Sequence, residues 1–262
     1  MKILVTNDDG ISAPGLRIAH DIAETLAGNE GQVIIVAPSS EKSGVAHSTS
    51  YIRPSLIEKI AENSYSVEGT PADCVLAGIY YVMNEQKPDL IISGVNRGQN
   101  IAEDVLYSGT IGAAMEGAIH GIKSIALSQS YSKNTLASHN EFNAANAYAA
   151  EVCQKLLLDD PFLESNFSGF YNVNFPACDS MQVKGIKVCA TGLRQGSSFS
   201  MSPQLSPTGK TFLWIKHNPR NLIPSSKSDG EYLKKDYITI SALKTELNWF
   251  EKNKDLKSLF QV

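Results

Sequence analysis

The chain has 262 residues, of which 42% are hydrophobic and 19% charged, which allows a sizeable core and argues against wholesale disorder. A net charge of −4 and a pI near 5.8 argue against a general nucleic-acid binder. The four cysteines stand far apart without a C-x-x-C pair, and no apolar run reaches transmembrane length. We therefore expect a reduced, soluble, cytoplasmic protein that binds neither membranes nor DNA.

The first half of the chain alternates strand and helix patterns. Apolar runs predict buried strands at residues 3–5, 33–36, 90–92 and 124–128. Helical periodicity and capping residues predict helices from Pro14 to about residue 27, from 71 to 83 behind Thr70 as N-cap, and over 111–120 and 141–158. Residues 49–53 and 65–68 resemble a short hairpin. This order predicts an α/β fold, a Rossmann-like doubly wound and mostly parallel sheet in a three-layer sandwich.

The second half reads differently, with strand patterns at residues 171–175, 186–190, 211–216 and 237–241. Residues 191–235 are rich in Ser, Gly, Pro and Asn, which is typical of a functional loop, an arm to a partner, or disorder. A final helix carries the apolar residues Trp249, Phe250, Leu256, Leu259 and Phe260. No linker divides the chain. We expect one domain over 1–262, with a catalytic core over about 1–130 and a β-hairpin arm plus C-terminal helix over about 170–262.

Two adjacent carboxylates follow the first strand, in the sequence Asn7-Asp8-Asp9-Gly10. Like charges repel, and aspartate is depleted in strands, so this pair is poor folding material. Hard-oxygen clusters suit Mg²⁺, Mn²⁺ or Ca²⁺, whereas Asp-Gly alone is typical of a solvated turn. This stretch by itself leaves both interpretations open.

Two further loops leave the carboxyl ends of predicted strands with polar side chains, and they contain Ser43 and Asn96. Singly, Ser43 fits a turn or cap, and Asn96 fits a left-handed loop position. Ligands bind at the carboxyl ends of such sheets, where these side chains and Asp8 and Asp9 would converge. Together they supply the oxygen donors of an octahedral divalent ion.

Ser108, Gly109 and Thr110 open a predicted helix. Its free N–H groups and positive dipole end suit an anion, although Ser108 also fits ordinary N-capping. The chain has no P-loop, no G-x-G-x-x-G after the first strand and no G-x-S-x-G elbow. A divalent metal facing a helix N-terminus is suited to phosphoester hydrolysis.

Three other residues near these motifs have two interpretations each. His47 fits either substrate binding and leaving-group protonation or a surface and capping role. Arg97 fits either a phosphate contact or a solvated loop. Tyr107 fits either stacking on a nucleobase or packing in the core or an interface.

The motifs resemble those of the SurE survival-protein family of nucleotidases. The resemblance rests on Met1–Gly15, on Ala37-Pro38 with Ser43-Gly44, on residues 69–75 and 93–100, and on the long match over 104–117. It is dense to about residue 128 and returns at 171–176, 184–186 and 237–241. Ala102 departs from a frequent glycine of the family, which is expected to alter the backbone of that loop.

The resemblance implies a metal-dependent phosphomonoesterase that removes phosphate from nucleoside 5′- and 3′-monophosphates, and some members also trim short polyphosphate. The family's metal ligands map onto Asp8, Asp9, Ser43 and Asn96, around one Mg²⁺ or Mn²⁺ per subunit. Asn100 and the turn Ser108-Gly109-Thr110 map onto the phosphate surroundings. The family forms dimers or tetramers that exchange C-terminal elements, which would suit residues 191–235 and the final helix.

The expected mechanism is attack on phosphorus by a water that the metal activates, with Asp8 or Asp9 as the catalytic base. Asn100 and residues 108–110 would hold the phosphate oxygens. Two alternatives remain: a non-catalytic module that senses nucleotide or metal on the same fold, and a transferase that passes the phosphate to an acceptor other than water.

Overall fold

The computed structural model describes residues 1–84, 86–137, 141–158, 169–193, 199–217, 225–248 and 250–260. Most of its strands join one nine-stranded sheet. In chain order the strands are β1 Lys2–Thr6, β2 Gln32–Pro38, β3 Ile57–Ala61, β4 Ser64–Val67, β5 Leu90–Arg97, β6 Lys123–Gln129, β7 Gly169–Phe175, β8 Ile186–Val188, β9 Phe199–Leu205, β10 Thr211–His217 and β11 Ile238–Lys244. The prediction of an α/β fold around a mostly parallel sheet is confirmed.

The strand order is β3-β4-β2-β1-β5-β6-β7-β11-β8, and only the β3–β4 and β7–β11 pairings are antiparallel. The order reverses at β1, which pairs with β2 on one side and β5 on the other. In open α/β sheets ligands bind at such a switch point, outside the carboxyl ends of the strands. At that end Thr6 of β1 pairs with Ser93 of β5. The residues that follow these two strands therefore emerge side by side.

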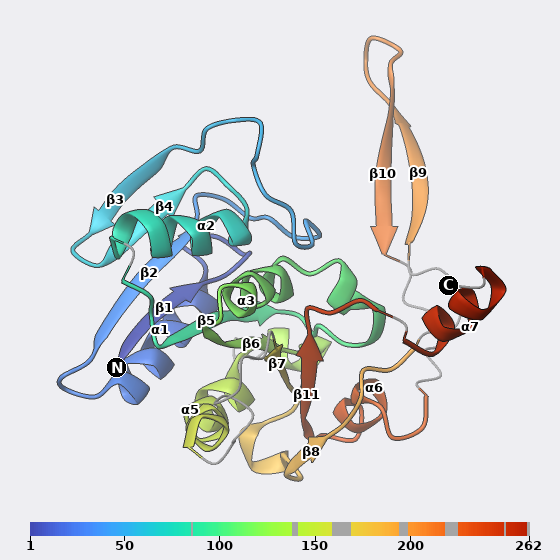
Figure 1. Ribbon diagram of the computed structural model, residues 1–262. Helices are drawn as coiled ribbons and strands as arrows, with labels where there is room; N and C mark the ends of the chain where they lie inside the picture. Colours follow the sequence, from blue (N-terminus) through green and yellow to red (C-terminus); the bar gives the residue numbers. More distant parts are fainter. Residues whose placement is uncertain are drawn as a thin grey trace.

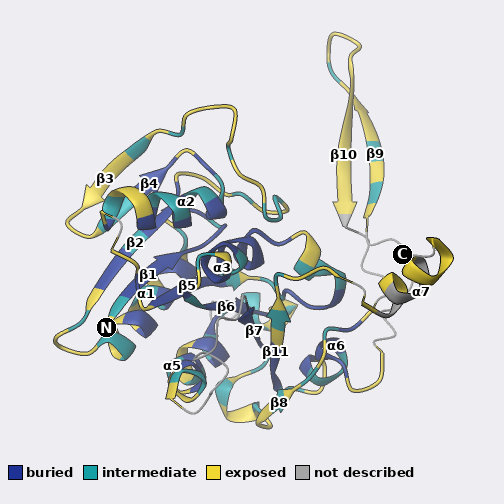
Figure 2. Cartoon of the chain, viewed as in Figure 1, coloured by how far each residue is buried: buried dark blue, intermediate teal, exposed yellow. Residues whose placement is uncertain are grey.

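Helices cover both faces of the sheet (Figure 1). They are α1 Pro14–Ala27, α2 Pro71–Ala77 with its π-helical extension Gly78–Val82, a 3-10 turn Ala102–Leu106, α3 Gly109–Ile119, α4 Lys133–Ala137, α5 Asn143–Leu158, a 3-10 turn Ser180–Gln182, α6 Asp229–Leu233 and α7 Phe250–Phe260. One core cluster joins α1 and α5 to the sheet, and two others lie beneath α2 and α3. Figure 2 shows that the central strands are mostly buried, with β7 buried over its whole length. None of the helices in the described parts of the chain is long and apolar enough to cross a membrane.

The hairpin prediction is half right. Residues 65–68 overlap β4, but residues 49–53 form no strand, and β4 pairs instead with β3. The N–H of Ser50 donates to Asp73, and the hydroxyl of Thr70 donates to the carbonyl of Ser48. These bonds tie the loop to the start of α2, so its backbone is not available for a strand ladder. The side chains of Tyr51 and Ile52, which suggested a strand, are almost fully exposed.

The stretch over residues 191–235 contains more regular structure than its composition predicts. It holds β9, which pairs antiparallel with β10, and the short helix α6. The β9–β10 hairpin projects away from the body of the protein (Figure 1). Residues 194–198 and 218–224 of this stretch, and Trp249 before α7, lie outside the described residues. The nine-stranded sheet draws β7, β11 and β8 from beyond residue 130, and the division of the chain at that point stays a prediction.

Candidate active site

Asp8 is a buried carboxylate that follows β1 and faces the first turn of α3. The hydroxyl of Thr110 donates to its Oδ1 at 2.6 Å, and the N–H of Thr110 donates to its Oδ2 at 3.2 Å. Two predicted motifs that lie 100 residues apart in the chain therefore meet in direct contact. The positive end of the α3 dipole adds a further favourable interaction with the carboxylate.

Burial raises the pKa of Asp8 to about 6, against the lowering effect of the Thr110 hydrogen bonds, and the charge of Asp9 raises it further. Burial also raises the pKa of Asp9, with a contribution from the charge of Glu41. Two neighbouring carboxylates with raised pKa values are typical of a functional site.

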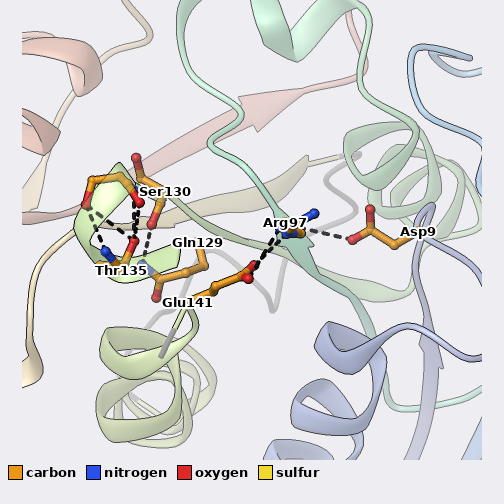
Figure 3. Close-up of polar contacts among 7 residues, drawn as sticks. Asp9, Arg97, Gln129, Ser130, Thr135 and Glu141 are labelled. Atoms are coloured by element: carbon orange, nitrogen blue, oxygen red, sulfur yellow. Dashed lines mark hydrogen bonds and ion pairs between the residues drawn. The ribbon is translucent and has the colours of Figure 1, made fainter. Parts of the chain in front are cut away.

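Asp9 is half-buried and faces the end of β5, where the N–H of Arg97 donates to its Oδ2 at 3.0 Å (Figure 3). The guanidinium of Arg97 turns toward Glu141, which it contacts at 2.5 Å, and lies over the ring of Tyr131. Arg97 thus holds Asp9 through its backbone, while its charge is directed to Glu141. The sequence offered a phosphate contact or a solvated loop for Arg97, and this exposed ion pair was not foreseen.

Asn96 precedes Arg97 at the end of β5 and is half-buried. Its side-chain amide donates to the carbonyl of Gly98 at 2.9 Å, which leaves the amide oxygen as its acceptor group. The pairing of β5 with β6 shifts register between Ser93 and Asn96. Gly94 permits this irregularity, because its φ is +138° and a Cβ there would lie 2.3 Å from the carbonyl of Leu127. Such a bulge re-aims the side chains that follow it.

Ser43 lies in the loop after β2, and a backbone hydrogen bond joins this loop to the loop after β1. The N–H of Lys42 donates to the carbonyl of Asp8 at 2.7 Å, which ties this loop to the carboxylate pair. The hydroxyl of Ser43 is exposed and donates to Glu41 at 2.7 Å. The backbone of the loop therefore lies against Asp8, whereas the Ser43 side chain bonds to Glu41 of its own loop, and its place among the metal ligands stays a prediction.

Asn100 is buried and belongs to a network of amides beneath the site. Its side chain donates to Ser128, its N–H donates to Asn174, and its carbonyl accepts from Asn172 and Asn174. These contacts tie Asn100 to β6 and β7 rather than to α3. The supporting residues were not identified from sequence, because an asparagine inside a β-strand pattern carries no sign of its partner.

The buried carboxylate of Asp229 stabilises the loop that follows Asn100. It accepts hydrogen bonds from the N–H groups of Ala102, Gly192 and Gly230. Ala102 has a φ of +50°, a conformation that glycine adopts more readily than alanine. The loop therefore has a glycine-like backbone conformation at Ala102.

The turn at residues 108–110 begins α3 as predicted. The hydroxyl of Ser108 accepts from the N–H of Ile111 at 3.2 Å, so Ser108 serves as the N-cap. Gly109 lies against the carboxylate, since a Cβ at this position would lie 2.9 Å from the Cβ of Asp8 and 3.1 Å from its Oδ2. Close approach of α3 to Asp8 requires glycine here.

His47 is held by α3 at a point beyond the turn. Its Nε2 contacts Glu116 at 2.5 Å, and His120 contacts the other oxygen of Glu116 at 3.0 Å. Burial opposes ionisation of Glu116, but the bonds and charges of the two histidines lower its pKa. Of the interpretations offered for His47, this arrangement fits an anchoring role, and Glu116 was not singled out from sequence.

The donor set decides which metal the site would suit. In the described parts of the chain, no three His, Cys, Asp or Glu side chains cluster as a metal site. A site here must therefore add neutral oxygens, from the Asn96 amide and the Ser43 hydroxyl, to the two carboxylates. Such a set fits a hard ion such as Mg²⁺ or Mn²⁺, which keeps several waters, better than zinc.

The chain is similar to known proteins over most of its length. The family model described as survival protein SurE matches residues 3–198. A protein named 5′-nucleotidase SurE from Roseobacter denitrificans is 45% identical, over 94% of this chain and 95% of its own length. One of the same name from Jannaschia is 44% identical over the full length of both chains. The crystal structure of the SurE protein from Aquifex aeolicus matches with a TM-score of 0.81 and 33% identity, over 99% of each chain.

Proposed function

The chain belongs to the survival protein SurE family, and from this premise we propose that it is a 5′-nucleotidase, which hydrolyses nucleoside monophosphates to nucleoside and phosphate. The observation that carries the proposal is the contact between Asp8 and Thr110, which joins a carboxylate pair to the N-terminus of a helix. A metal-binding group and an anion-binding group at one place suit a phosphoester. We extend the proposal to 3′-monophosphates and to short polyphosphate.

We further propose that Asp8, Asp9, Asn96 and Ser43 hold one Mg²⁺ or Mn²⁺ per subunit. The metal would supply an activated water and neutralise negative charge on the phosphate. For Ser43 to take part, its hydroxyl must leave Glu41. The residue is exposed, so no packed neighbour holds its hydroxyl at Glu41.

Residues of the chain are proposed to orient the phosphate and to accept the proton of the attacking water. The N–H groups of Thr110 and Ile111 already donate to Asp8 and Ser108, so we propose that the first turn of α3 orients the phosphate oxygens through its dipole and the N–H of Gly109. Asn100 holds the loop that closes this side of the site through its bonds to β6 and β7. Asp8, fixed in orientation by Thr110, is proposed to take the proton of the attacking water.

An assay of phosphate release tests the proposal. The substrates are nucleoside 5′-monophosphates, nucleoside 3′-monophosphates and short polyphosphate, each with EDTA, with Mg²⁺ and with Mn²⁺. We expect release from the monophosphates that EDTA abolishes and added metal restores. Saturable binding of nucleotide without release would instead identify a sensing module. Release that requires an added alcohol acceptor would identify a transferase.

We also propose that the protein forms a homodimer or homotetramer through the β9–β10 hairpin and α7. The hairpin exposes apolar side chains on both faces, among them Phe212, Trp214, Leu213 and Ile215. An isolated two-stranded hairpin is marginally stable, and exposed apolar surface of this kind marks an interaction site. On α7 the side chains of Phe250, Leu259 and Phe260 are exposed as well.

Light scattering tests the oligomer. Replacing Leu213 and Ile215, which share one face of β10, by aspartate is expected to lower the particle mass to that of a monomer. Lys210→Glu, at the tip of the same hairpin, is the matched charge-changing control and is expected to leave the mass unchanged. An unaltered mass in the double variant would contradict the proposal.

The four free thiols support a reducing compartment, and we propose the cytoplasm.

A further inference from the structure

Tyr107 immediately precedes the turn that begins α3, and its side chain is partly exposed. Its backbone is fixed on both sides, because its N–H donates to Asp104 at 3.0 Å and its carbonyl accepts from Ala46 at 2.9 Å. The residue as a whole is nevertheless 49% exposed. The chain thus holds an aromatic side chain in a defined place next to the proposed phosphate site without burying it.

A second aromatic ring reaches the same place from a distant segment. Phe199, the first residue of β9, lies with its ring centroid 5.2 Å from that of Tyr107, at an interplanar angle of 78°. Phe199 is 39% exposed. Both side chains of this edge-to-face pair are partly exposed, so part of their apolar surface is accessible to a ligand. The pair joins the base of the projecting hairpin to the turn at residues 108–110.

We propose that Tyr107 and Phe199 form the stacking platform for the nucleobase of the substrate. The inference rests on the proposed nucleotidase function and goes beyond it, because it assigns the base, rather than the phosphate, to particular residues. In a nucleoside monophosphate the base lies one ribose away from the phosphorus. Tyr107 lies one residue before the turn proposed to bind the phosphate, so its ring is placed to contact the base of the same nucleotide.

Stacking of this kind accepts any base, because every base has a π-face. We therefore expect KM to depend strongly on the presence of a base and only weakly on which base is present, with larger rings bound more tightly. Since the base does not change during hydrolysis, its contacts are the same in the ground state and the transition state. Their loss is expected to raise KM and to leave kcat nearly unchanged.

The test compares Tyr107→Ala and Phe199→Ala with wild type on a nucleoside 5′-monophosphate and on glycerol phosphate, which has no base. We expect KM for the nucleotide to rise about tenfold in Tyr107→Ala and somewhat less in Phe199→Ala, with kcat within about twofold. KM for glycerol phosphate is expected to stay unchanged. Tyr107→Phe, which keeps the ring, is expected to behave as wild type. Tyr81→Ala, at another exposed tyrosine, is the matched control.

A second measurement does not require catalysis. Calorimetric titration with adenosine, which carries no phosphate, is expected to show weak binding that Tyr107→Ala abolishes and Tyr107→Phe retains. Equal KM changes on both substrates, or no change on either, would overturn the inference. A changed particle mass in Tyr107→Ala, together with equal losses of activity on both substrates, would also overturn it. That result would assign the two rings to packing between subunits. Absence of phosphate release from wild type would refute the nucleotidase proposal, and adenosine binding would still test the platform.

Discussion

Asp8→Asn is expected to abolish phosphate release and, at the same time, to stabilise the protein from which metal has been removed. The activity falls because the neutral amide is a weaker metal ligand and a poorer proton acceptor than the carboxylate. We expect kcat at saturating Mn²⁺ to fall by at least about 100-fold, the scale seen when one strong electrostatic contact is removed from an active site. Phosphate release over a Mn²⁺ titration measures this.

The stability gain follows from the sign of the pKa shift. Burial raises the pKa of Asp8 from 3.8 to about 6 in the folded, metal-free protein. Between these two values the folded state retains a proton that the unfolded state has released. The contribution of Asp8 to stability is therefore lost as pH rises through this window, and above about pH 6 the charged group destabilises the fold by about 3 kcal/mol.

Asparagine removes this penalty but cannot accept both hydrogen bonds from Thr110. With one such bond worth about 1 kcal/mol, the net gain at pH 8 is expected to be about 1–2 kcal/mol. Chemical denaturation with EDTA present, at pH 4 and pH 8, measures it, and the gain should appear only at the higher pH. Asp9→Asn is the matched comparison, because it should also inactivate the enzyme but Asp9 is less buried and gives a smaller gain. Full turnover in Asp9→Asn at saturating Mn²⁺ would refute the site assignment.

Gly109→Ala is expected to reduce turnover by about 100-fold without unfolding the protein. The added methyl group would lie 2.9 Å from the Cβ of Asp8 and 3.1 Å from Pro71, so either Asp8 or the start of α3 must move. A misplacement of about 1 Å in an active site costs on the order of 100-fold in rate. Steady-state kinetics on a nucleoside monophosphate measures the loss.

Gly117→Ala provides the control for overpacking on the same helix. Its methyl group would meet the hydroxyl of Ser124 at 2.3 Å and Ile91 at 2.6 Å, both remote from Asp8. We expect it to lower the free energy of unfolding by about 1–3 kcal/mol, at least as much as Gly109→Ala, while kcat changes little. If the two variants lost activity in proportion to stability, Gly109 would have no special relation to the site.

The local sequence was sufficient to predict most strands of the sheet and the position of the carboxylate pair. The runs at residues 3–5, 33–36 and 90–92 are apolar because both faces of their strands are covered, and this leaves a pattern that needs no knowledge of the partner strands. Pro14 and Thr70 identify two helix starts for equally local reasons, a missing N–H and a side-chain cap. Asp8 and Asp9 stand out because two adjacent like charges at the end of a buried strand repel each other.

Tertiary structure decided the features that depend on a partner far away in the chain. The loop at residues 49–53 has strand-like side chains, but the N–H of Ser50 donates to Asp73, and the carbonyl of the preceding Ser48 accepts from Thr70. The strand β9 contains Pro203 and serines and becomes a strand by pairing with β10. Short exposed strands carry little hydrophobic periodicity of their own, so their existence depends on the pairing.

The same distinction applies within the site. Its donor types and their places at the strand ends follow from the order of residues along the chain. The orientation of each side chain does not, because it is set by neighbours: Glu41 engages Ser43, Ser128 engages Asn100, and Thr110 fixes Asp8. A hydrogen bond needs its two atoms within about 3 Å, and only the packed fold determines which atoms come that close.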